Sequence, residues 1–119
     1  MEQFRQGDVL LTKLEAAPRE IQGMIEPSRA VDRLVLAFGE VTGHAHAIYP
    51  EVEVIDGVEV KKDVPAKIWD AGAERFLQVI EKTALKHEEH GAIDLEPGFY
   101  RISQQREYDP QLHSRVVAD

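Results

Sequence analysis

One stretch constrains the fold of this chain most strongly, because it specifies a β-hairpin by itself. From residue 51 to residue 60, apolar side chains alternate with glutamates on both sides of Asp56-Gly57. Such alternation is typical of a strand whose two faces meet different surroundings. Asp-Gly is a residue pair that closes a two-residue hairpin turn. The sequence therefore predicts a β-hairpin over residues 51–64.

Short β-compatible runs bounded by glycine, proline or other turn residues recur along the rest of the chain. Besides the hairpin, they predict strands at residues 4–14, 33–41, 44–49, 66–69, 75–85 and 99–104. A helix is the alternative for the shorter apolar runs, but their length and their β-branched residues favour strands. Many short strands with regular turn signals indicate an all-β fold, either a small β-barrel or a β-sandwich.

The length of the chain fits one domain. It has 119 residues, of which 43% are hydrophobic and 30% charged, which is typical of a globular protein with one core. We therefore expect a single all-β domain over residues 1–119. Near its end, Asp109-Pro110 is a pair that can begin a helix. Residues 109–119 are accordingly predicted to be a short helix or a loose tail.

Charge and composition exclude several classes of function. The formal net charge is −8 and the basic residues are scattered, so binding to nucleic acid is disfavoured. No apolar run approaches the length of a membrane helix, roughly 20 residues, and the polar N-terminus lacks the apolar core of a signal peptide. These features predict a cytoplasmic protein that does not enter a membrane. The sequence leaves the oligomeric state open.

A pair of histidines follows the second predicted strand. His44 and His46 are separated by one alanine, and in a strand residues i and i+2 project from the same face. Their small neighbours Gly43, Ala45 and Ala47 allow a second strand or a ligand to approach closely. Two imidazoles on one face of a strand form half of a site for a transition metal. A polar strand face is the alternative.

A second pair of histidines lies in Lys86-His87-Glu88-Glu89-His90. His87 has the same strand parity as the apolar Leu85, which predicts that it points to the interior and supplies the third ligand. His90 adjoins Gly91, where a turn would bring it in as a fourth ligand. On a helix, His87 and His90 would share a face and both could bind. These arrangements remain open at this point.

The absence of cysteine restricts the metals and ligands that such a site can use. No thiolate is available, so a metal would bind through His44, His46, His87, His90 and a carboxylate, which Glu51, Glu40, Glu89 or Glu107 could supply. Imidazole ligands suit Zn, Fe, Ni and Cu, and an added carboxylate suits Mn. Three histidines with an open position would activate water or bind a small-molecule ligand.

The spacing of these residues resembles the first motif of the cupin superfamily. Gly39, His44-Ala45-His46, Glu51 and Gly57 follow its order, although each flanking glycine is one residue too close. Gly91 and Pro97-Gly98 are similar to the second motif, but Arg101 stands near the position of its metal-binding histidine. The resemblance implies a small double-stranded β-helix with a metal inside the barrel. It also implies that His87 or His90 replaces the missing ligand.

Two functions follow from the sequence. The first is a metal-binding β-barrel protein, which would act as a metal-dependent enzyme on a small molecule if the metal keeps an open position. The second is a non-catalytic interaction or accessory module whose histidines are structural or respond to pH. The substrate and the reaction are not specified by the sequence.

Overall fold

The prediction of an all-β fold is confirmed. The computed structural model describes residues 2–38, 44–104, 106–109 and 113–116, the last two ranges by their backbone. These residues form thirteen strands and one short 3-10 helix, η1 (Arg19–Ile21). Every strand pairing among them is antiparallel. In this part of the chain, no helix has the length and apolar character needed to cross a membrane.

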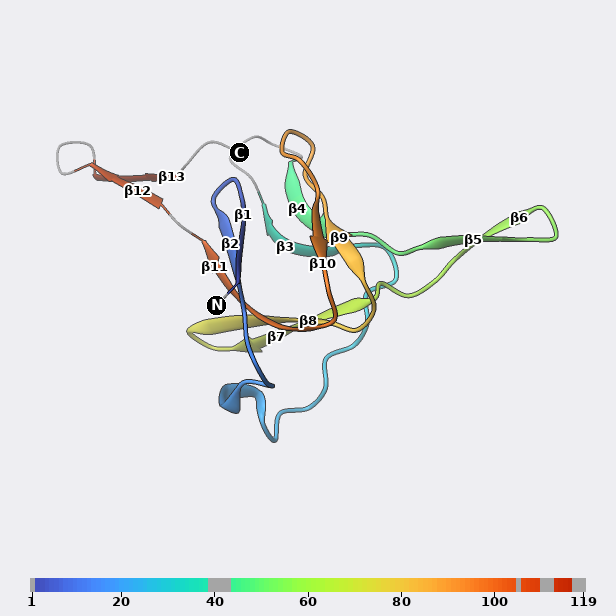
Figure 1. Cartoon of the computed structure of the whole chain (residues 1–119), viewed down its shortest axis with the longest axis horizontal. Helices are drawn as coiled ribbons and strands as arrows, with labels where there is room; N and C mark the ends of the chain where they lie inside the picture. The colour runs from blue at the N-terminus through green and yellow to red at the C-terminus, as the bar shows by residue number, and fades with distance from the viewer. Residues whose placement is uncertain (1, 39–43, 105, 110–112, 117–119) are drawn as a thin grey trace.

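A five-stranded sheet forms the larger layer (Figure 1). Its strands lie in the order β1-β2-β11-β8-β7, with the bounds β1 (Gln3–Gln6), β2 (Val9–Lys13), β11 (Gly98–Gln104), β8 (Glu74–Val79) and β7 (Ala66–Ala71). Strand β11 connects the N-terminal hairpin to the β7–β8 hairpin, because it pairs with both β2 and β8. Segments from the beginning, the middle and the last third of the chain are thus held in one sheet.

Two further strand pairs form a smaller layer. One pair is β3 (Leu34–Phe38) with β4 (Ala45–Ile48), and the other is β9 (Thr83–Leu85) with β10 (Ile93–Leu95). Ala47 and Lys86 join the two pairs through reciprocal backbone hydrogen bonds of 2.9 and 2.8 Å. Among the described strands the sheets do not close into a barrel, and the arrangement is consistent with a small β-sandwich.

The core lies between these layers. Its buried side chains come from both, and those with no exposed surface include Val9, Leu11, Ile48, Leu77, Leu85, Leu95 and Tyr100. Strand β4 is buried along its whole length, so both of its faces are covered. A buried strand that carries His46 must satisfy a polar side chain inside the protein.

The predicted hairpin at residues 51–64 is confirmed. Strands β5 (Val52–Ile55) and β6 (Val58–Lys61) pair around Asp56 and Gly57, whose φ angles are 52° and 78°. Positive φ at both central residues is the geometry that an Asp-Gly turn favours. Figure 1 shows this hairpin extending away from the two layers, and all its strand residues are exposed.

Three predicted elements differ from the structure. Residues 4–14 are two strands, because the chain turns at Gly7, whose φ is 57°. Residues 75–85 are also two strands, β8 and β9, separated where the N–H of Ile80 donates 2.8 Å to the carbonyl of Pro65. Residues 109–119 are predicted to be a short helix or a loose tail, whereas the backbone described there is extended, with β12 (Arg106–Asp109) paired to β13 (His113–Val116).

Candidate functional site

The register between β4 and the segment after β9 brings the two histidine pairs together. Ala47 and Lys86 are directly opposite. In an antiparallel pair, His46 then faces His87 one step along, and His44 faces Glu89 two steps further. The observed contacts agree with this register, because the ring centres of His46 and His87 are 4.4 Å apart and His44 Nδ1 is 3.6 Å from Glu89 Oε1.

All four predicted histidines lie in one group, which we call the histidine centre and define as His44, His46, His87 and His90. The ring of His90 is 4.7 Å from that of His87 and stacks at 6.3 Å on that of His46. The ring of His44 meets that of His87 edge to face at 5.6 Å. Leu85 and His87 are both buried, as their shared parity predicts, and the turn before Gly91 returns His90 to the group.

Gln6 fixes the orientation of His46. Its amide Nε2 donates to the carbonyls of Leu85 at 3.0 Å and Gly91 at 2.9 Å, so its Oε1 must face the other way. That oxygen lies 2.9 Å from His46 Nδ1, and because it can only accept, Nδ1 must carry the proton. Gln6 and His46 are both buried. One side chain thus holds the ring of His46 and both sides of the 86–90 loop.

Asp8 lies at the other nitrogen of the same ring. Its side chain is fully buried, and one oxygen, Oδ2, accepts a 2.7 Å hydrogen bond from Gln104 Nε2. The other oxygen, Oδ1, is 3.3 Å from His46 Nε2 but has no hydrogen bond among the described residues. A buried carboxylate oxygen is costly unless a hydrogen-bond donor or a cation lies beside it. A cation bound at Asp8 would satisfy this oxygen.

Acidic side chains border the centre on its exposed side. Glu88 Oε2 accepts a 2.9 Å hydrogen bond from the N–H of Ala45, which holds the 86–90 loop against β4. This bond is the largest cause of a pKa for Glu88 below its ordinary value, and the nearby His87 and His44 lower it further. The N–H of Glu89 donates 3.0 Å to His87 Nδ1, which assigns that nitrogen as an acceptor. The centre thus combines imidazoles with carboxylates, without a thiolate.

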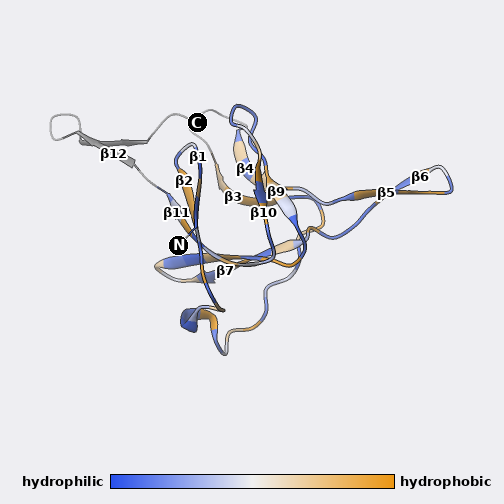
Figure 2. Cartoon of the chain, in the orientation of Figure 1, coloured by the Kyte–Doolittle hydropathy of each residue, from blue (hydrophilic) through white to orange (hydrophobic). Residues whose placement is uncertain are grey.

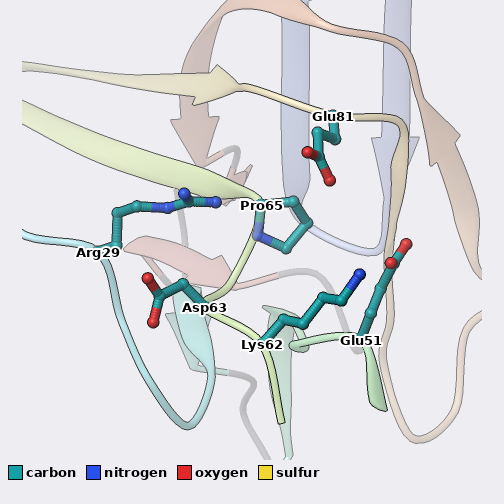
Figure 3. Close-up of a pocket in the computed structure, with 6 residues that line it drawn as sticks. All are labelled: Arg29, Glu51, Lys62, Asp63, Pro65 and Glu81. Carbon is teal, nitrogen blue, oxygen red and sulfur yellow. The ribbon is translucent and has the colours of Figure 1, made fainter. Parts of the chain in front are cut away.

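The structure places Glu51, one of the carboxylates predicted from the sequence, away from the histidine centre. Figure 3 shows it at the base of the β5–β6 hairpin, in a pocket whose other lining residues are Arg29, Lys62, Asp63, Pro65 and Glu81. Within the described residues, no histidine lines this pocket. Arg101, at the position of the second cupin motif, lies on β11 near Glu20 and Glu74 and also contacts Phe76. Gly39 and Glu40 lie outside the described residues.

Sequence reasoning missed Gln6 and Asp8 as parts of this site. Gly7-Asp8 is typical of a turn, and nothing near it in sequence suggests a contact with a histidine almost forty positions away. Burial of both polar side chains is the signal that identifies them, and it exists only in the folded chain.

Comparisons with known proteins place the chain in a family. Searches of curated proteins and of solved structures give no significant match. A family described as a domain of unknown function, DUF8820, matches residues 5–105. That range includes every residue of the histidine centre, together with Gln6, Asp8 and Glu88. Because the match spans most of the 119 residues, the chain belongs to this family of domains of unknown function, DUF8820.

Proposed function

We propose that the protein binds one divalent transition metal ion at the histidine centre. The observation that carries this proposal is the meeting of four imidazole rings from two segments about forty residues apart, beside the buried carboxylate of Asp8. Clusters of histidine and carboxylate are the ligand sets that first-row transition metals use. In this proposal Asp8 takes the role that the sequence suggested for Glu51.

The spacing of the rings supports a shared ion. A Zn–N bond of about 2.1 Å places the centres of two imidazoles on one tetrahedral ion about 5 Å apart. The ring centre of His87 lies 4.4 Å from that of His46, 4.7 Å from that of His90 and 5.6 Å from that of His44. His87 would therefore be the central ligand, with the rings of the other three histidines around it.

Binding requires the side chains to turn. Among the described residues, no group of three or more His, Asp or Glu side chains is positioned to hold an ion as the rings stand. His90 Nε2 is buried and has no hydrogen bond within this part of the chain, so turning that ring breaks no bond made by this nitrogen. Rotation about the two side-chain bonds of a histidine redirects its ring nitrogens. His46 Nδ1 is held by Gln6 Oε1, so Nε2, which lies 3.3 Å from Asp8 Oδ1, would be the nitrogen that binds the ion.

The ligand set restricts which metal fits. Imidazoles with a carboxylate suit Zn, Fe, Ni, Cu or Mn. The number of protein ligands decides whether a coordination position on the ion remains open. If three protein ligands bind the ion, it would activate water or hold a small-molecule ligand, as in a metal-dependent enzyme. His44 has 21% of its side chain accessible, whereas His46 and His87 are buried, so His44 would lie on the side of the ion that faces solvent.

A cupin-like arrangement is part of this proposal. Support for it comes from the short spacing of His44 and His46 at the start of β4, and from His87, which follows β9. The second motif gives no support, because Arg101 lies beside Glu20 and Glu74. The remaining ligands would come from residues 87–90, before the position at which the superfamily places its last histidine.

Calorimetry with chelator-treated protein, purified without an affinity tag, tests the proposal. We expect one Zn²⁺ or Co²⁺ ion per chain, and an unfolding free energy that rises by about 2.7 kcal/mol at one hundred times the dissociation constant. His90→Ala should weaken binding by more than tenfold, whereas the control His113→Ala, in β13, should leave it unchanged. Absence of both heat and stabilisation with Zn²⁺, Co²⁺, Ni²⁺ and Mn²⁺ would refute the proposal.

A structural role for the histidines is the second candidate. It is favoured by the hydrogen bonds that Gln6 makes to His46, Leu85 and Gly91, which join β1 to the 86–90 loop without any ion. In that case His46→Asn would destabilise the protein equally with and without added metal. Under the metal proposal, the difference between parent and variant grows when Zn²⁺ is present.

A further inference from the structure

The β5–β6 hairpin exposes apolar side chains that have no cover. Val54, Val58 and Val60 have relative exposures of 67%, 61% and 41%. Figure 1 shows the hairpin projecting from the body, and Figure 2 shows hydrophobic residues along β5 within it. An isolated two-stranded hairpin gains little stability from its own contacts. Exposed β-branched residues on such an arm indicate a surface for another protein.

The backbone N–H and C=O groups of β6 that do not bond to β5 belong to Glu59 and Lys61. Ile55 and Val58 flank the two-residue turn, so they form a hydrogen-bonded pair, as do Glu53 and Val60 two steps along. The N–H and C=O groups of the intervening residues point away from β5. In the described part of the chain, β6 has no other strand partner. The outer edge of β6 can therefore accept a further strand.

We propose that this edge pairs with the same edge of a second copy of the chain. The two β6 strands would run antiparallel, with a two-fold axis at Val60 and Val60 facing its own equivalent. The sequence Val58-Glu59-Val60-Lys61-Lys62 then places Glu59 opposite Lys61 of the second copy, and Lys61 opposite its Glu59. A two-fold axis repeats each contact, as in most homodimers.

Backbone and side chains support the same register. Glu59 and Lys61 carry the outward backbone groups, so the oppositely charged residues also form the hydrogen-bonded pairs of the new ladder. Val60 occupies the closer, non-hydrogen-bonded position, where apolar side chains meet best. Lys61 is now 3.7 Å from Asp32, but both side chains are well exposed, and such a pair holds Lys61 only weakly.

The outer edge of β5 lacks this complementarity. An antiparallel pairing of Glu51-Val52-Glu53-Val54-Ile55 with its own copy about Glu53 would set two glutamates directly opposite each other. Like charges in facing positions destabilise a sheet. Of the two edges of the hairpin, the charge pattern therefore selects β6. The product is a four-stranded sheet, β5-β6-β6-β5, that joins two protein bodies.

Sedimentation equilibrium over a wide protein concentration range tests this dimer with the full chain. Glu59→Lys sets lysine against lysine, and Lys61→Glu sets glutamate against glutamate. Because the axis repeats the contact, either change should raise the dissociation constant about tenfold or more. Glu53→Lys, which makes the same charge change on β5, is the matched control and should leave dimerisation unchanged.

A mixture of the two variants distinguishes this register from other modes of association. Neither variant pairs well with itself, but an equimolar mixture should form a heterodimer, because each lysine at these positions on one chain then faces a glutamate on the other. The double variant that combines Glu59→Lys with Lys61→Glu should dimerise like the parent for the same reason. The strand residues of β6 are exposed and do not enter the core, so circular dichroism should show that every variant is folded. A parent that stays monomeric at all concentrations, or a dimer that is insensitive to both single changes, would overturn the proposal.

Discussion

Replacing Gln6 by leucine tests how the histidine centre is held together. The side chain is buried and makes three hydrogen bonds, to the carbonyl of Leu85, the carbonyl of Gly91 and His46 Nδ1, all between 2.9 and 3.0 Å. Leucine fills a similar volume but bonds to none of them. Each lost bond removes about 1 kcal/mol of net stability, and a partner left buried and unsatisfied loses more.

The expected loss is therefore about 3 kcal/mol in the free energy of unfolding. For a chain of this size that corresponds to a fall of roughly 10 °C in the midpoint of thermal unfolding. Urea unfolding, followed by circular dichroism and by the fluorescence of Trp69, measures the free energy directly. Gln3→Leu on the same strand is the control, because Gln3 is exposed and makes one bond of 3.5 Å, to Thr12.

A second readout connects this residue to the proposed metal. A residue that orients a ligating histidine through its other nitrogen typically contributes about 10- to 100-fold to metal affinity. Gln6→Leu should weaken Zn²⁺ binding by that factor, and Gln3→Leu should not change it. If the two variants differ by less than about 0.5 kcal/mol in stability, Gln6 does not organise the centre and the reasoning fails.

Three further changes have defined outcomes. Glu88→Gln should lower the free energy of unfolding at neutral pH but not in acid. The pKa of Glu88 is below its ordinary value, so its carboxylate stabilises the fold above about pH 4.5 and loses this effect as the pH falls. Urea midpoints of parent and variant at several pH values measure the effect, and a difference between them that stays constant with pH would contradict it. Tyr100→Phe removes a 2.6 Å hydrogen bond from a buried hydroxyl to the carbonyl of Glu96 and should lower the free energy of unfolding by about 1 kcal/mol. An unchanged urea midpoint would show that this bond does not stabilise the fold. Gly57→Ala should reduce the free energy of unfolding by about 1–2 kcal/mol, as thermal unfolding would measure, through its φ of 78° alone, since no atom lies near the added methyl group.

The sequence by itself specifies the local elements well where alternation and turn chemistry agree. The Asp56-Gly57 hairpin is confirmed, because both the strand period and the turn act within a few residues. Sequence reasoning failed at residues 4–14 and 75–85, where both halves of each stretch are β-compatible and were joined across a change of direction. A strand pattern reports extended backbone on each side of a turn, but it does not say that the two sides form one strand.

The predicted site divides in the same way. Strand parity within one segment places His44 with His46 and turns His87 inward, so those relations follow from sequence alone. Which segments meet depends on the register of Ala47 with Lys86, and that register is decided by how the whole core packs. Only the tertiary structure adds Gln6 and Asp8 to the centre and moves Glu51 to the base of the hairpin. Long-range contacts of this kind have no local sequence signal, because a buried polar group is satisfied by whichever distant segment the packing of the core brings beside it.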